Sequence, residues 1–205
     1  VGPQGRGELG ELVDAPVDGV VERAFIHLEG VARVQRHYGA ARVVITPSQD
    51  MWMAGYAARK APSQGKVQEL YAKALAFEDE TGARFVLLTT DLLGLPRSLA
   101  QQIAALAKEQ LGVPRERLIL SFSHTHCGPV IGGDRLVDMY GLDPAEQGRV
   151  DEYTRGLPER FRQVMAEALS RLEPCQVEWG VGRAGFAMNR RQYTTNGVTG
   201  GANPI

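Results

Sequence analysis

Alternating apolar and polar positions predict most of the strands of this chain. Short runs rich in β-branched and aromatic residues, ARVVITP before Pro47 and RERLILSFSHTH up to His126, are typical of strands. YAKALAFED and ARFVLLTTDLL flank the short turn ETG, a pattern that predicts a β-hairpin. A late strand with a glycine-rich middle is predicted in CQVEWGVGRAGFAMNRR.

Helical spacing of apolar residues marks the remaining elements. PRSLAQQIAALAKEQLG begins with Pro96 and closes with Gly112, and these residue types favour a helix start and a helix end. PAEQGRVDEYTRGLPERFRQVMAEALSRLEP is also helical, with a break predicted near Pro158 because proline removes a backbone hydrogen bond. VVERAFIHLEGVARVQ, within residues 17–35, predicts an amphipathic helix after a loose leader.

The order of these elements predicts the fold class. Strand, hairpin, helix, strand, helix and strand together indicate an α/β or layered α+β fold, in which helices flank a mixed β-sheet. The chain stops at Ile205 in the loop GVTGGANPI without a closing element. We therefore expect it to be truncated at its C-terminus.

Composition and charge argue against some partners. The net charge is -1 and there is no dense Lys/Arg block, so we expect no binding to nucleic acid. The apolar run FVLLTTDLLGL contains Asp91 and is shorter than a membrane-spanning helix. Cys127 and Cys175 lack CxxC spacing, and the sequence leaves open whether they form a disulfide.

Candidate chemistry is concentrated in SFSHTHCGPV, residues 121–130. His124 and His126 stand two residues apart, so in a strand they would face the same side about 7 Å apart. Gly128 and Pro129 then end the strand, and strand ends in α/β sheets are where sites are built. The pair is compatible with a metal site, with a catalytic pair, or with two structural histidines at a sheet edge.

A zinc site would need more ligands than this pair supplies. Zinc takes three or four protein ligands, and no histidine follows His126. The two earlier histidines, His27 and His37, are expected at the surface or at element boundaries. The missing ligands are therefore expected beyond residue 205.

Five sequence blocks carry a resemblance to a known family. In chain order they are MAGY (Met53–Tyr56), YAKAL (Tyr71–Leu75), TDLLG (Thr90–Gly94), SHTHCGP (Ser123–Pro129) and NRR (Asn189–Arg191). Their order and spacing resemble the N-terminal part of the catalytic domain of the neutral/alkaline, non-lysosomal ceramidase family. The resemblance covers residues 41–205 and leaves residues 1–40, a leader and its helix, uncovered.

The resemblance implies a zinc-dependent hydrolase of N-acyl amide bonds, of the kind that cleaves ceramide to sphingosine and a fatty acid. It implies His124 as a zinc ligand, His126 as a catalytic group that positions water or substrate, and Arg190 as a catalytic contact near the scissile amide. The family's other zinc ligands, a second His, a Glu and a Tyr, come later in its chain. The 205-residue chain alone is therefore expected to be inactive.

Four further residues are expected around these groups. Asp91 is a candidate partner for the second ring nitrogen of His124, or else a turn cap before Pro96. Gly55, Tyr56 and Asn189 are expected to line the substrate or to support the residues that contact it. Cys127 is expected to be a small buried residue and not a nucleophile.

The implied partner is a lipid or another amphiphilic amide, with contact to a membrane surface. The resemblance implies a secreted, periplasmic or membrane-associated protein. Two alternatives stay open. Ser123, Cys127 and Arg191 depart from the family's THTHSGP and NRS segments, which leaves room for a metal-dependent hydrolase of the same fold with a non-ceramide substrate. The other alternative is a non-catalytic fragment with a structural histidine pair.

Overall fold

The computed structural model describes residues 36–56, 58–133, 140–177, 182 and 189–200. The chain divides into two compact units, one of residues 33–177 and the other of residues 1–32 with 178–205. The helix predicted within residues 17–35 lies outside the described residues. Each unit is considered by itself below.

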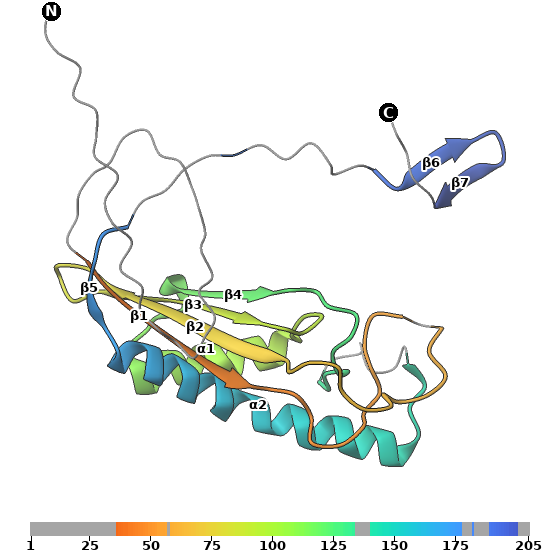
Figure 1. Cartoon of the computed structure of the whole chain (residues 1–205), viewed down its shortest axis with the longest axis horizontal. Helices are drawn as coiled ribbons and strands as arrows, with labels where there is room; N and C mark the ends of the chain where they lie inside the picture. The colour runs from red at the N-terminus through yellow and green to blue at the C-terminus, as the bar shows by residue number, and fades with distance from the viewer. Residues whose placement is uncertain (1–35, 57, 134–139, 178–181, 183–188, 201–205) are drawn as a thin grey trace, which may run out of the picture. The chain divides into compact units, whose positions relative to one another are not determined.

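The larger unit is built on a five-stranded mixed sheet (Figure 1). Its strands are β1 (Arg36–Val44), β2 (Tyr71–Glu78), β3 (Arg84–Thr90), β4 (Leu118–Phe122) and β5 (Glu173–Cys175). Their order in the sheet is β4-β3-β2-β1-β5, with β3 and β4 parallel and the other neighbours antiparallel. The predicted fold class is confirmed. β1 begins at Arg36, ahead of the boundary expected at residue 41.

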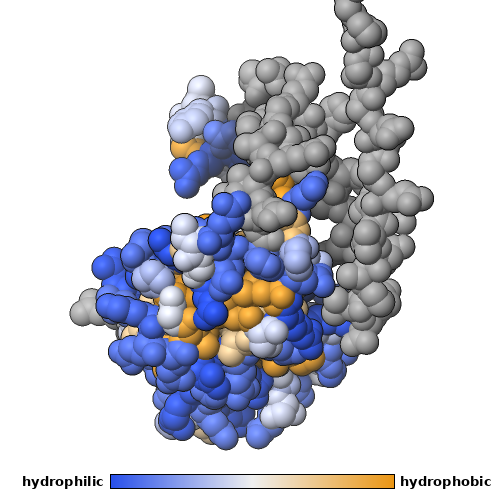
Figure 2. Space-filling view, turned by 90° about the vertical axis from the view of Figure 1, so that its left-hand side faces the viewer, coloured by the Kyte–Doolittle hydropathy of each residue, from blue (hydrophilic) through white to orange (hydrophobic). Residues whose placement is uncertain are grey.

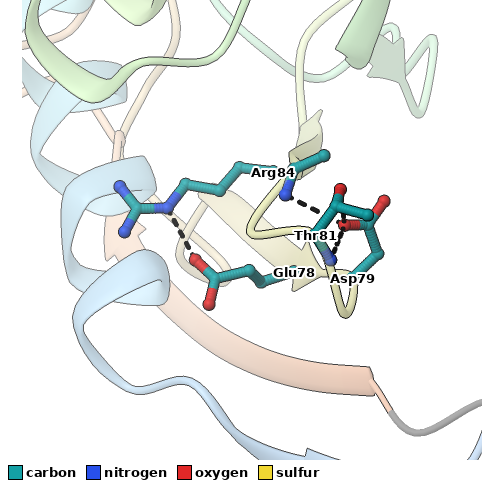
Figure 3. Close-up of polar contacts among 5 residues, drawn as sticks. Glu78, Asp79, Thr81 and Arg84 are labelled. Atoms are coloured by element: carbon teal, nitrogen blue, oxygen red, sulfur yellow. Dashed lines mark hydrogen bonds and ion pairs between the residues drawn. The ribbon is translucent and has the colours of Figure 1, made fainter.

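The hairpin predicted around ETG is formed by β2 and β3, with Leu75 opposite Leu87. Asp79 organises its turn, because the carboxylate accepts hydrogen bonds from the Thr81 hydroxyl and from backbone N–H groups of the turn (Figure 3). Arg84 pairs with Glu78 across the same end at 2.9 Å (Figure 3). Local polar contacts therefore close this end of the hairpin.

Two long helices, α1 (Arg97–Leu111) and α2 (Pro144–Ser170), lie against one face of the sheet (Figure 1). α1 ends as predicted at Gly112, which has the left-handed conformation that glycine adopts readily, with φ 68°. α2 approaches β1 so closely that a β-carbon at Gly39 would lie 2.0 Å from the Ala168 carbonyl oxygen.

The core lies between the sheet and the two helices. Alternate strand residues are buried there, as expected for a sheet with one covered face. On the face of the molecule shown in Figure 2, hydrophilic residues surround an apolar patch. The largest fully buried side chains are Phe161, Ile45, Leu88, Leu92, Ile103, Leu157, Met165, Val86, Val113, Val130, Val150 and Val164.

The break predicted near Gly156 is wrong, because α2 runs through Pro158 without interruption. A proline inside a helix costs about 3 kcal/mol because one backbone hydrogen bond is lost. Here Leu157, Pro158 and Phe161 are all buried against the rest of the unit. Burial of this helix face offsets the local cost of the proline.

The smaller unit contains the β6–β7 hairpin, with β6 at Arg191–Thr194 and β7 at Gly197–Gly200. Of the late strand predicted in CQVEWGVGRAGFAMNRR, the described residues include its two ends, Cys175 in β5 and Arg191 at the start of β6. Residues 178–181 and 183–188 of that segment lie outside the described residues. No helix in the described part of the chain has the length and apolar character needed to cross a membrane.

Candidate functional site

The two histidines lie in a loop that follows β4. The strand ends at Phe122 and not at His126 as predicted, because His124 has a φ of 55°. Residues other than glycine seldom adopt this left-handed conformation, which interrupts the alternation of a strand. The two imidazoles nevertheless lie together, with ring centroids 5.2 Å apart and planes at 63°. The loop, and not strand geometry, brings the pair together.

His124 is hydrogen-bonded to the loop that follows β3. The backbone N–H of His124 donates to Leu92 O at 3.1 Å, and Nδ1 of its ring lies 2.8 Å from Leu93 O. A carbonyl oxygen can only accept, so Nδ1 carries the proton and the lone pair of the neutral ring is on Nε2. Metal-binding histidines commonly engage a backbone carbonyl in this way. The residue is also exposed, so the ring fits the role of a metal ligand.

Asp91 is engaged elsewhere and not with His124. Its Oδ2 accepts from Tyr71 N at 2.9 Å, while its own N–H donates to Tyr71 O at 2.9 Å. The sequence suggested Asp91 as the partner of the His124 ring, but the Leu93 carbonyl takes that place. Asp91 joins the end of β3 to the start of β2, just before the two residues that hold His124.

Gly55 provides the space that the His126 ring occupies. A β-carbon at Gly55 would lie 2.4 Å from Cγ of His126, and the backbone there has a φ of +98°. Tyr56 meets the same ring edge-on, with centroids 4.7 Å apart. The Nδ1 atom of His126 is buried and has no hydrogen-bond partner among the described residues.

Backbone pairing joins the segment around Gly55 to the segment after His126. Ala54 N donates to Gly128 O at 2.9 Å, and Val130 N donates to Trp52 O at 2.8 Å. Gly55 N donates to the Tyr140 hydroxyl at 2.9 Å. Two of the sequence blocks, MAGY and SHTHCGP, are therefore adjacent in space.

Arg59 and Tyr140 are site neighbours that sequence reasoning missed. Arg59 Nη2 donates to the carbonyl oxygen of His126, and its guanidinium carbon lies 5.2 Å from the centroid of the Tyr56 ring. Neither residue lies in a strand or an α-helix, so no periodic pattern predicts which side chains they will meet. No signal in the sequence would have singled them out.

Asn189 and Arg190 belong to the smaller unit and are exposed just before β6. Asn189 Oδ1 accepts from Arg191 N at 2.9 Å, which shapes the entry to the hairpin. The expected approach of Asn189 and Arg190 to the histidine pair stays a prediction.

Cys127 is exposed and not buried as expected. It lies beside the histidine pair, with its N–H donating to the Thr125 hydroxyl at 3.2 Å. Cys127 and Cys175, which both belong to the described residues, form no disulfide with each other.

The described residues do not complete a metal site by themselves. No group of three or more His, Cys, Asp or Glu side chains suited to a metal ion occurs among them. A cavity of about 170 Å³ lies between residues 47–51 and α2, and none of the predicted site residues lines it. The histidine pair is thus apart from this cavity, with His124 on an open surface.

Two solved ceramidase structures share this fold. A ceramidase complexed with C2 matches with a TM-score of 0.57 and 25% identity, over 69% of this chain and 22% of that chain. The neutral ceramidase from Pseudomonas aeruginosa matches with a TM-score of 0.56 and 25% identity, over 70% of this chain and 23% of that chain. No known protein-family profile and no curated protein matches the chain. The chain spans less than a quarter of either structure, and its similarity to a part of the neutral ceramidases confirms the resemblance predicted from the sequence blocks.

Proposed function

We propose that this chain supplies part of the active site of a zinc-dependent hydrolase that cleaves N-acyl amide bonds, with ceramide as the substrate. The observation that carries the proposal is the fixed ring of His124, whose Nδ1 is engaged by Leu93 O. The structural similarity to neutral ceramidases supports the same reaction class.

His124 would hold zinc through Nε2, the ring nitrogen that keeps its lone pair. When bound, zinc supplies Lewis-acid chemistry, since it polarises a carbonyl and lowers the pKa of water to about 7. The ligands that complete the site would come from polypeptide outside the described residues. The backbone of His124 supports a functional role, because a non-glycine residue with positive φ costs about 1–2 kcal/mol that glycine would avoid.

His126 and Arg190 would act on the substrate. An imidazole beside the metal ligand can accept a proton from the attacking water and return it to the leaving amine. Because Nδ1 of His126 is buried, this exchange falls to Nε2. Arg190 would donate to the carbonyl oxygen as negative charge develops there, since a guanidinium remains charged at every relevant pH.

The proposed substrate is a lipid or another amphiphilic amide. Tyr56 is 55% exposed next to His126, and an exposed aromatic ring suits contact with a hydrocarbon chain that enters from a membrane surface. With the resemblance, this supports a secreted, periplasmic or membrane-associated protein.

A non-ceramide amide is the second candidate substrate. Exposed Cys127 follows the histidine pair, and Arg191 follows Arg190, where the family segments have serine. Each change replaces a polar residue that is adjacent in sequence to a residue assigned to the proposed site. The metal chemistry would be the same and the substrate different.

The test is metal analysis followed by substrate comparison. A longer protein that includes this chain and supplies the remaining ligands, purified without chelator, should contain about one zinc per active site, and added zinc should raise its hydrolysis of N-acyl amides. A metal content far below this value, with no activation by zinc, contradicts the proposal and favours a structural histidine pair. Comparing ceramide with short N-acyl amides then separates the two candidate substrates.

A further inference from the structure

One guanidinium contacts both the backbone and the ring surroundings of His126. Arg59 Nη2 donates to His126 O, while the guanidinium carbon lies 5.2 Å from the centroid of the Tyr56 ring. Tyr56 in turn meets the His126 ring at 4.7 Å between centroids, at an angle of 72°. Arg59 N also donates to Tyr56 O at 3.2 Å, which closes the turn that carries both side chains.

His126 lacks the hydrogen bond that usually fixes a functional histidine. Such a histidine is generally oriented by a partner on the ring nitrogen that does not react. His124 has that partner in Leu93 O, but Nδ1 of His126 is buried without one among the described residues. Among the described residues, the contacts that orient the His126 ring are packing contacts with Gly55, Tyr56 and His124.

The two imidazoles are held by different loops. His124 is attached to Leu92 and Leu93 after β3, whereas His126 is attached to residues 55–59. A change in residues 55–59 should therefore reach His126 without altering the hydrogen bond of the His124 ring.

We propose that Arg59 is a positioning residue that sets the orientation of the His126 ring, through the His126 carbonyl and through the Tyr56 ring. The expected effect on catalysis rests on the proposed function, whereas the orientation of the His126 ring does not. Arginine suits the role because its planar guanidinium can donate a hydrogen bond and face an aromatic ring at the same time. A lysine ammonium keeps the charge but has neither the planar shape nor the fixed fork of donors.

The direct test is NMR spectroscopy of the histidine rings, with each imidazole assigned from a His→Gln variant. We expect Arg59→Ala to shift and broaden the ring signals of His126, while those of the neighbouring His124 move much less and those of His37 stay in place. Arg59→Lys should give a smaller change in the same direction.

Tyr56→Leu is the second variant, and it tests the ring contact alone. Tyr56 is largely exposed, so its removal leaves the core intact. We expect it to perturb the same His126 signals, and its effect in the double variant with Arg59→Ala should be less than additive because the Arg59–Tyr56 contact is lost in either single variant. Arg84→Ala is the matched control, because Arg84 is another arginine with a local partner, Glu78, at the far end of the β2–β3 hairpin (Figure 3).

The inference is overturned if the His126 ring signals are unchanged in Arg59→Ala, whatever Tyr56→Leu does, or if the signals of His124 move by as much. In an active protein, misplacing the ring should lower kcat roughly 10- to 100-fold with KM within about twofold, and Arg59→Lys should restore part of kcat. A His126 ring effect in a protein that neither binds zinc nor cleaves amides would retain the positioning role and refute the proposed function. Zinc-dependent amide hydrolysis by the protein, with His126 ring signals that do not move in Arg59→Ala, would support the proposed function and refute the positioning role.

Discussion

The imidazole of His126 packs directly against Gly55, where a β-carbon would lie 2.4 Å from the imidazole Cγ and 2.7 Å from Nδ1. This contact makes the glycine of the MAGY block part of the site although it carries no functional group. The glycine is required twice, for the space it leaves and for its φ of +98°.

Gly55→Ala should therefore displace His126 and destabilise the fold. Gly65→Ala is a matched control, because Gly65 has a similar φ of +102° but open space around it. Gly65→Ala should lower the free energy of unfolding by about 1–2 kcal/mol through backbone strain alone. Gly55→Ala should lower it by about 1–3 kcal/mol more, because its β-carbon clashes with the His126 ring. Urea-induced unfolding measures both, and equal losses in the two variants would show that the histidine contact is unimportant.

In a protein that supplies the remaining ligands, His124→Asn should abolish the proposed zinc binding while the fold is retained. Asparagine tolerates positive φ better than most residues, and its side-chain amide can donate to Leu93 O in place of Nδ1. It has no atom at the position of Nε2, so the metal ligand alone is lost.

Zinc content of the purified protein and the urea midpoint are the two measurements for this variant. We expect the free energy of unfolding to change by less than about 1 kcal/mol. His37→Asn, in β1, is the control and should leave zinc content unchanged. If His124→Asn keeps its zinc, His124 is not a ligand.

Substitutions of Asp91 separate its structural role from an effect on the metal ligand. Its Oδ2 accepts from Tyr71 N, so Asp91→Ala should cost about 1–3 kcal/mol by leaving that N–H without its partner. Asp91→Asn keeps an acceptor oxygen and should lose less. A drop in zinc affinity in Asp91→Asn, at unchanged stability, would instead support an electrostatic action of Asp91 on His124.

The turn between β2 and β3 predicts a pH dependence of stability. The pKa of Asp79 lies below its ordinary value of 3.8, chiefly because the Thr81 hydroxyl donates to the carboxylate, with a further hydrogen bond from Ala83 N. Since the folded-state pKa is the lower one, this contribution is complete above the unfolded-state pKa and is lost as pH falls through the folded-state pKa.

The stability difference between the wild type and Asp79→Ala should thus be constant above about pH 5 and should shrink as the pH is lowered below about 4. Urea midpoints measured across this range give the result. Glu80→Ala removes an exposed acid from the same turn and serves as the control. A difference that grows on acidification would contradict the assignment.

Local signals in the sequence predicted the hairpin and α1 because turn chemistry and terminal residues determine those elements. ETG joins two strands of matched length, and Gly112 has the backbone conformation needed to end α1. α2 shows the limit of such signals. Pro158 predicts a break, but the burial of Leu157 and Phe161 is a tertiary effect that outweighs it.

The histidine pair was visible in the sequence, but the geometry around it was not predictable. The HxH pair was visible in the sequence, but the positive φ of His124 and the Leu93 carbonyl behind its ring depend on the path of the loop. Arg59 and Tyr140 meet the site only through contacts between segments distant in sequence. Such contacts leave no trace in composition or periodicity.

Because the two imidazoles are attached to different loops, the surroundings of each histidine can be changed by mutation separately from those of the other. Residues 92–93 govern the ring that is suited to the metal, whereas residues 55–59 govern its neighbour. Under the proposed function, substitutions at Tyr56 and Arg59 should change reactivity or substrate choice while the hydrogen bond that fixes the proposed metal ligand stays in place. A library confined to these two positions would test that separation directly.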